Sequence, residues 1–141
     1  MTRKDLQKFI AAHRWAVEAT TATSARPQAA VIGFVVSDAL ELFFDTLTSA
    51  RKYANLRASP QIALVIGWDE GCTVQYEGIA DEPSGAELAQ WKALYFARFP
   101  DGREREALPD IAYIRVKPLW LRFSDFRTTP PLIIERRRDE L

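Results

Sequence analysis

The chain of 141 residues contains one cysteine, one histidine and one methionine. A single cysteine cannot form an internal disulfide, which is compatible with a reducing cytoplasm. No cluster of His, Cys, Asp and Glu has metal-ligand spacing, and one histidine with one cysteine cannot build a typical zinc site. We therefore expect a cytoplasmic protein without a bound metal, in which Cys72 is a small buried or edge residue rather than a nucleophile.

Other signals are missing as well. Nineteen basic residues balance nineteen acidic ones, so the overall charge does not favour a nucleic-acid or membrane partner. No apolar run reaches transmembrane length, and no apolar segment follows the N-terminus, so we expect no secretory signal. The sequence has no Walker loop, no Gly-x-Ser-x-Gly elbow and no Gly-x-Gly-x-x-Gly. If the protein is an enzyme, a cofactor is expected to carry its reaction.

Short apolar or alternating stretches separated by turn residues dominate what is present. They predict strands at residues 15–21, 28–36, 40–45, 61–68, 73–80, 111–117 and 120–123. Residues 61–68 are almost wholly apolar, which predicts a strand covered on both faces. Most connections are too short for helical crossovers, so the sequence predicts a mainly antiparallel sheet closed into a small barrel. We expect one domain at residues 1–128, followed by a C-terminal tail at 129–141 in which residues 135–141 are charged and frayed.

An amphipathic helix is predicted near the N-terminus, because Leu6, Phe9 and Ile10 recur at helical spacing. His13 continues this apolar stripe. A residue on such a stripe is expected to pack at the end of the helix, although a role as a catalytic base stays open.

A second amphipathic helix is predicted after residue 84. Ser84 and Glu87 have the spacing of a capping box. The apolar residues that follow share one helix face: Leu88, Trp91 and Tyr95. The charged run at residues 103–106 is interpreted as a solvated loop.

The stretch from residue 43 to residue 56 passes from an apolar strand end into a short helix. Ser49 is the expected N-cap, and Tyr53 and Leu56 would share its buried face. Arg51 and Lys52 fall in the first turn, where the helix dipole already disfavours cations. Free amides, hydroxyl groups and two cations together suit a docked anion such as a phosphate. A solvated pair on a surface helix explains the two cations equally well.

Several segments together resemble the pyridoxamine 5'-phosphate oxidase-like flavoproteins, which are FMN-binding split barrels. The resembling segments are residues 17–21, 26–34, 42–46, 49–56, 61–66, 73–80 and 113–118, and their order matches from about residue 4 to residue 126. The resemblance implies a split barrel of six to seven mostly antiparallel strands. It also implies a homodimer with FMN at the subunit interface.

The resemblance implies nine cofactor-binding residues: Val31, Ile32, Gly33, Asp45, Thr46, Ser49, Arg51, Lys52 and Thr73. Arg51 and Lys52 would bind the phosphate. The strand 31–33 would run alongside the flavin ring, which could approach the backbone at Gly33 because this residue has no side chain. A bulge or a packing gap explains the same glycine. Thr73 would contact the flavin of the partner subunit.

The chain departs from the true oxidases at three places. Ala30 stands where they carry an arginine, Ser124 falls at a flavin-contacting tryptophan, and the Arg-x-His motif near the C-terminus is missing. We therefore expect an FMN-dependent oxidoreductase with an unidentified small substrate, not the namesake activity. Alternatives are a deazaflavin- or haem-binding protein, with His13 as the haem ligand, a non-catalytic flavin sensor or storage protein, and an interaction barrel without a cofactor.

Overall fold

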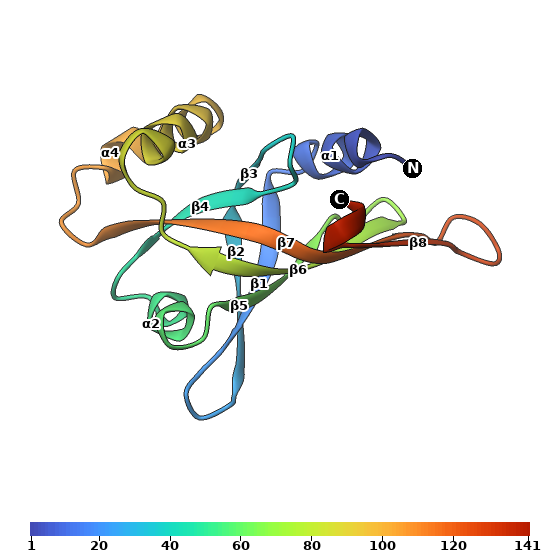
Figure 1. Ribbon diagram of the computed structural model, residues 1–141, viewed down its shortest axis with the longest axis horizontal. Helices are drawn as coiled ribbons and strands as arrows, with labels where there is room; N and C mark the ends of the chain where they lie inside the picture. Colours follow the sequence, from blue (N-terminus) through green and yellow to red (C-terminus); the bar gives the residue numbers. More distant parts are fainter.

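The computed structural model describes residues 1–141 as one curled antiparallel sheet with short helices around it (Figure 1). The strands are β1 (Trp15–Thr21), β2 (Pro27–Gly33), β3 (Val35–Val36), β4 (Leu42–Leu47), β5 (Gln61–Ile66), β6 (Cys72–Asp81), β7 (Ile111–Asp125) and β8 (Leu132–Arg137). The helices are α1 (Arg3–Ala11), α2 (Arg51–Ala58), α3 (Gly85–Arg98) and α4 (Gly102–Arg105), with a final 3₁₀ turn, η1 (Arg138–Glu140). The predicted split barrel is confirmed.

The sheet curls because its two edges are joined directly. Its strand order is β2-β1-β5-β6-β7-β4-β3, so β2 and β3 lie at opposite edges. In the sequence only Phe34 separates them, and this residue is fully buried. The predicted single strand at 28–36 is therefore two strands, one paired with β1 and the other with β4.

β7 is the long central strand and carries the second half of the barrel. It pairs with β6 from Arg115 to Asp125, and on its other side with β4 first and then with β8. Two strands were predicted here, because proline cannot donate to a ladder. Instead, the register shifts between Glu77 and Gly78, opposite Pro118. A Cβ at Gly78 would lie 2.6 Å from the Lys117 carbonyl oxygen, so only glycine permits this close approach.

The core fills the curl of the sheet, and α3 closes one side of it. Phe43 of β4 is fully buried. Its ring stacks on Trp91 of α3 at 5.3 Å between centroids and on Tyr113 of β7 at 5.7 Å. The predicted apolar face of this helix is confirmed, because Trp91 and Tyr95 are buried and Leu88 packs against the core.

Three local predictions are wrong. Ser84 is the N-cap of α3 but its side chain makes no capping hydrogen bond, and the Glu87 carboxylate pairs with Arg115. The last residues are not frayed: β8 pairs with β7 from Trp120 to Asp125. β5 is not covered on both faces, since its burial alternates strictly and leaves Val65 exposed.

α1 and the start of β1 agree with the predicted pattern. Leu6 and Ile10 are buried and Phe9 packs against the core. His13 follows the helix, with Nδ1 2.8 Å from the Phe9 carbonyl oxygen and its ring 4.7 Å from that of Phe9. These contacts confirm that His13 packs at the helix end. None of the helices has the length and apolar character needed to cross a membrane.

Candidate functional site

A cleft of about 530 Å³ opens between β2, the end of β4, the start of α2 and the corner between α3 and α4. It gathers seven of the nine predicted site residues: Val31, Ile32, Gly33, Asp45, Thr46, Ser49 and Lys52. The other lining residues are Trp15, Leu47, Ala50, Tyr95, Phe99, Asp101 and Arg105. The structure thus brings together residues from separate segments of the chain. Whether they hold a cofactor stays a prediction.

The start of α2 forms one end of the cleft. Its N-cap is Ala50, in extended conformation, and not Ser49 as predicted. Because alanine has no side-chain acceptor and the first turn has no acidic residue, no side chain caps the amides there. The Ser49 side chain, one residue earlier, is exposed and lines the cleft. This end therefore offers a hydroxyl group and uncapped helix amides to a ligand.

Lys52 adds a positive charge at this end. It lines the cleft and forms no ion pair with any carboxylate of the chain. Glu18 of β1 lies near it, is 2% exposed, and has one carboxylate oxygen without a hydrogen-bond partner. Burial raises the pKa of Glu18, and the charge of Lys52 partly offsets this effect. The Lys52 charge is therefore not neutralised by a direct partner.

The rest of α2 fixes the helix to the sheet. Leu56 is buried and Tyr53 half-buried, as predicted. The buried Asn55 amide donates hydrogen bonds of 2.9 Å to the Thr20 hydroxyl and of 2.9 Å to the Gln28 side chain. These bonds tie the helix to β1 and β2, and so fix the position of its N-terminus.

Arg51 is exposed and does not line the cleft. Of the two cations that the sequence singled out, only Lys52 is part of the cleft wall. Arg51 precedes it by one residue in the same helical turn, so its side chain projects in a different direction around the helix. Its predicted contact with a phosphate stays a prediction.

The α4 end of the cleft wall contains a hydrogen-bonded network around Asp45. Tyr95 donates a hydrogen bond of 3.1 Å to one Asp45 oxygen, and Arg105 Nε donates one of 2.7 Å to the other. Arg105 also binds Asp101 at 2.7 Å. Burial would lower the pKa of Arg105, but its bonds to Asp45 and Asp101 outweigh burial and raise it. The pKa of Tyr95 is raised, first by burial and then by Asp45.

This network corrects one prediction and adds residues that the sequence did not reveal. The run at 103–106 is not simply a solvated loop, because Arg105 belongs to α4 and anchors Asp45. Tyr95 was predicted only as an apolar helix residue. No sequence signal links Asp45 with Arg105, sixty positions later.

Gly33 faces the cleft, but another part of the chain fills the space beside its backbone. A Cβ at Gly33 would lie 2.7 Å from Phe99 Cε1 and 3.2 Å from Trp15 Cζ3. The missing side chain therefore makes room for the Phe99 ring, which is the packing explanation of this glycine.

Thr73 does not line the cleft. It lies on β6, opposite Ser124 of β7, and its hydroxyl oxygen is buried without a hydrogen-bond partner. The resemblance implies a contact with the flavin of the partner subunit, so a position outside its own chain's cleft agrees with that prediction and does not test it. His13 is also absent from the cleft wall.

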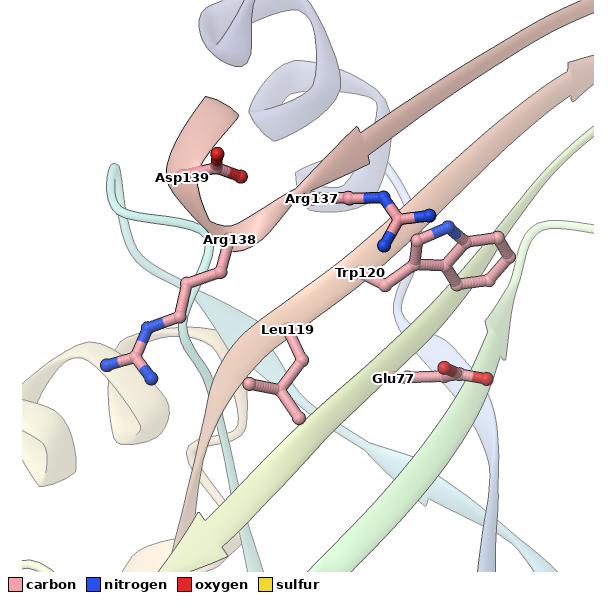
Figure 2. Close-up of a pocket in the computed structure, with 6 residues that line it drawn as sticks. All are labelled: Glu77, Leu119, Trp120, Arg137, Arg138 and Asp139. Atoms are coloured by element: carbon pink, nitrogen blue, oxygen red, sulfur yellow. The ribbon is translucent and has the colours of Figure 1, made fainter.

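A second, more open hollow of about 770 Å³ lies on the outer face of β6, β7 and β8 (Figure 2). Arg137 reaches toward the Trp120 indole, its direct cross-strand partner, and Arg138 points away. Glu77 and Asp139 complete the charged lining. Two positive and two negative charges cancel, so the lining has no net charge to select an anion, and none of the predicted site residues is part of it.

Comparisons with solved structures define the class of this fold. A haem-binding protein from Mycobacterium smegmatis aligns with a TM-score of 0.85 at 16% identity, covering 99% of this chain and 60% of that one. The haem storage protein HutZ from Vibrio cholerae aligns with a TM-score of 0.72 at 20% identity, covering 84% of this chain and 91% of that one. General Stress Protein 26 from Bacillus anthracis aligns with a TM-score of 0.72 at 18% identity, covering 95% of this chain and 98% of that one. At these identities the likeness concerns the fold.

The fold and the cleft thus define a split barrel with a cleft of about 530 Å³ beside a helix N-terminus. Within this class, the chain belongs to the pyridoxamine 5'-phosphate oxidase family, whose model matches residues 2–125. The resemblance predicted from the sequence is confirmed. No curated protein matches the chain. The chain spans 60% of the length of the mycobacterial protein.

Proposed function

We propose that this protein binds FMN in the cleft and performs a two-electron redox reaction on a small molecule. The observation that carries the proposal is the pairing of an unneutralised cation, Lys52, with the uncapped start of α2 at one end of a cleft lined by the Val31–Gly33 strand. The cleft volume of about 530 Å³ lies within the range of roughly 300–1,000 Å³ that is usual for small-molecule sites.

The phosphate of FMN fits the α2 end. Its charge would meet Lys52, the Ser49 hydroxyl and the first amides of the helix, the arrangement that favours anions at helix N-termini. Thr46, 8% exposed at the end of β4, would lie beside it. Asp45 needs no ligand cation, because Arg105 already neutralises it. The bound flavin would supply the two-electron chemistry, and the protein would bind and orient it.

We propose a homodimer with the cofactor at its interface. On the outer face of the sheet, Val31, Val17 and Val65 are cross-strand neighbours on β2, β1 and β5. Val31 is 62% exposed and Val65 38%. Val17 between them is partly exposed, and exposed apolar residues that adjoin on one face are a feature of interfaces. A second copy on this face would bury these valines and could bring its Thr73 to the cleft.

The test is the absorption spectrum of the purified protein, before and after FMN is added and free FMN removed by gel filtration. The proposal expects a flavin spectrum that co-elutes with a dimer-sized species. NAD(P)H oxidation by the loaded protein, with and without electron acceptors, then separates an oxidoreductase from a non-catalytic flavin protein. No retained flavin and no binding below about tens of micromolar would contradict the proposal.

Haem is the second candidate, favoured by the fold shared with two proteins named for haem binding or storage. His13 does not line the cleft, and its Nδ1 lies against the Phe9 carbonyl oxygen. Haem in this cleft would therefore need a different axial ligand. Titration with haemin tests the candidate: a Soret shift that survives FMN saturation places haem elsewhere, and competition between the two ligands places both in one cleft.

A further inference from the structure

The space beside the Gly33 backbone is already occupied by an aromatic ring. Phe99 lies so close that a Cβ at Gly33 would be 2.7 and 2.8 Å from two of its ring carbons. Phe99 is 3% exposed and is the C-cap residue of α3. On the side to which a Gly33 side chain would point, a planar ligand can therefore reach the backbone only if this ring leaves its place.

Several contacts hold the Phe99 ring in place. Its centroid lies 5.0 Å from that of Tyr95 and 6.0 Å from that of Trp15. The Arg14 guanidinium lies 4.5 Å from the ring centroid, a favourable cation–π distance. Tyr95 is in turn bonded to Asp45. Displacing Phe99 would disrupt an aromatic cluster that the Asp45 network fixes to the sheet.

Trp15 presents an exposed aromatic side chain at the cleft wall, with the Arg14 guanidinium 5.6 Å from its ring centroid. It is paired with Gly33 across β1 and β2, so both lie at the same level of the cleft. It lines the cleft and is 50% exposed, although indole side chains are usually largely buried. An exposed aromatic ring at the wall of a cleft can stack on a flat ligand.

We propose that Trp15 is the ring-binding residue of this site and that Phe99 is its fixed back wall. A planar ligand stacks on Trp15 and does not reach the Gly33 backbone. The inference rests on the proposed function, since it names where the ring of the cleft's ligand lies. It selects flat aromatic ligands, and it assigns the ring end and the phosphate end of the cleft to different residues.

The experiment measures the affinities of FMN and riboflavin for the full-length protein and for Trp15→Leu. Riboflavin has the same ring without the phosphate. We expect Trp15→Leu to weaken both ligands about tenfold, the effect of losing one stacking contact. Trp15→Phe keeps a ring and should weaken them less than about threefold. Trp68→Leu is the matched control, because Trp68 is 53% exposed but lies outside the cleft; its affinities should not change.

Tryptophan fluorescence gives a second readout that does not depend on the stability of Trp15→Leu. Flavin binding should quench the wild-type signal, and Trp15→Phe should lose most of that quenching whereas Trp68→Phe keeps it. Phe99→Leu removes the back-wall ring. If the ligand displaces Phe99 to reach Gly33, this variant binds more tightly than wild type, which would overturn the inference.

Wild-type affinity and quenching in the Trp15 variants would also overturn it, while leaving FMN binding intact. If the wild-type protein binds neither FMN nor riboflavin but binds haemin, the same variants are titrated with haemin, whose ring is also planar. Binding of none of the three contradicts both the proposed function and this inference.

Discussion

Two cations line the cleft, Lys52 at the start of α2 and Arg105 in α4, and they differ in what they contact. Arg105 binds Asp45 and Asp101, each at 2.7 Å. Lys52 has no ion-pair partner, and the nearby Glu18 lies too far away to form one. The charge of Arg105 is thus neutralised within the fold, whereas that of Lys52 stays available to a ligand.

The difference separates two tasks within one cleft. At the α4 end, hydrogen bonds and stacked rings from Tyr95, Phe99 and Arg105 fix the shape of the wall. At the α2 end, uncapped helix amides and Lys52 leave the electrostatics incomplete. A cation counts as a ligand-binding candidate when the fold does not already use its charge, and not merely because it lines a cavity.

The largest expected effect is on ligand affinity at the α2 end of the cleft. Lys52→Met should weaken FMN binding by about 2–3 kcal/mol, the contribution of a hydrogen bond to a charged group. Riboflavin, which lacks the phosphate, should bind almost as before. Isothermal titration calorimetry of both ligands checks this. Equal losses for FMN and riboflavin would mean that Lys52 contacts the ring or shapes the cleft.

At the α4 end of the cleft the expected effect is on the stability of the fold. Arg105→Met leaves Asp45 with Tyr95 as its only hydrogen-bond donor and should lower the free energy of unfolding by about 2 kcal/mol. Lys52→Met is the control and should change it by less than about 0.5 kcal/mol. Urea denaturation measures both. If Arg105→Met unfolds at the same urea concentration as the wild-type protein, the Asp45 network does not stabilise the cleft wall.

Glu18 gives a pH-dependent test of whether Lys52, at the α2 end of the cleft, is a free cation. Its folded-state pKa is raised above the ordinary value of 4.5, because burial disfavours the charged form. The folded state therefore keeps a proton that the unfolded state releases, and wild-type stability falls as pH rises from about 4.5 through the folded-state pKa. Glu18→Gln cannot titrate. It should match the stability of the wild-type protein at pH 4.5 and exceed it at pH 8.

Thermal melts of both proteins at pH 4.5 and pH 8 measure this difference. Glu77→Gln, at an exposed position of β6, serves as the control. If Glu18→Gln is less stable than wild type at pH 8, the ionised carboxylate of Glu18 stabilises the fold, and Lys52 is its partner rather than a free cation.

The smallest effect is expected at Arg51, which is exposed and outside the cleft wall. Arg51→Ala should weaken FMN binding by about 0.5 kcal/mol, the size of a screened surface interaction. In titrations at low and high salt, the FMN affinities of Arg51→Ala and of the wild-type protein should converge as the salt concentration rises. A loss as large as that of Lys52→Met would place the phosphate on the outer side of α2.

Local patterns predicted much of the fold. β1 was predicted at its observed bounds, and the 43–56 segment was correctly identified as a strand that leads into a helix. Seven predicted site residues share one cleft because the resembling motifs lie on β2, β4 and α2, which the barrel brings together. Alternation and helical spacing are set by neighbours in sequence, so the sequence reveals them.

Several of the errors come from contacts between distant parts of the chain. Pro118 does not end β7 because Gly78 on β6 accommodates it. Arg105 is not simply a solvated residue, because Asp45, sixty positions earlier, binds it. The packing explanation of Gly33, which the sequence left open beside a flavin contact, depends on Phe99, at the end of a helix that the sequence predicted only from its own apolar face. No local pattern encodes such pairs.

The central claim is that the cleft holds FMN by its phosphate at the α2 end. The most direct test is calorimetric titration of the wild-type protein with FMN and, separately, with riboflavin. The claim predicts FMN binding at tens of micromolar or tighter, with riboflavin weaker by about 2–3 kcal/mol because it lacks the charged phosphate. No FMN binding, or equal affinity for the two ligands, would contradict it.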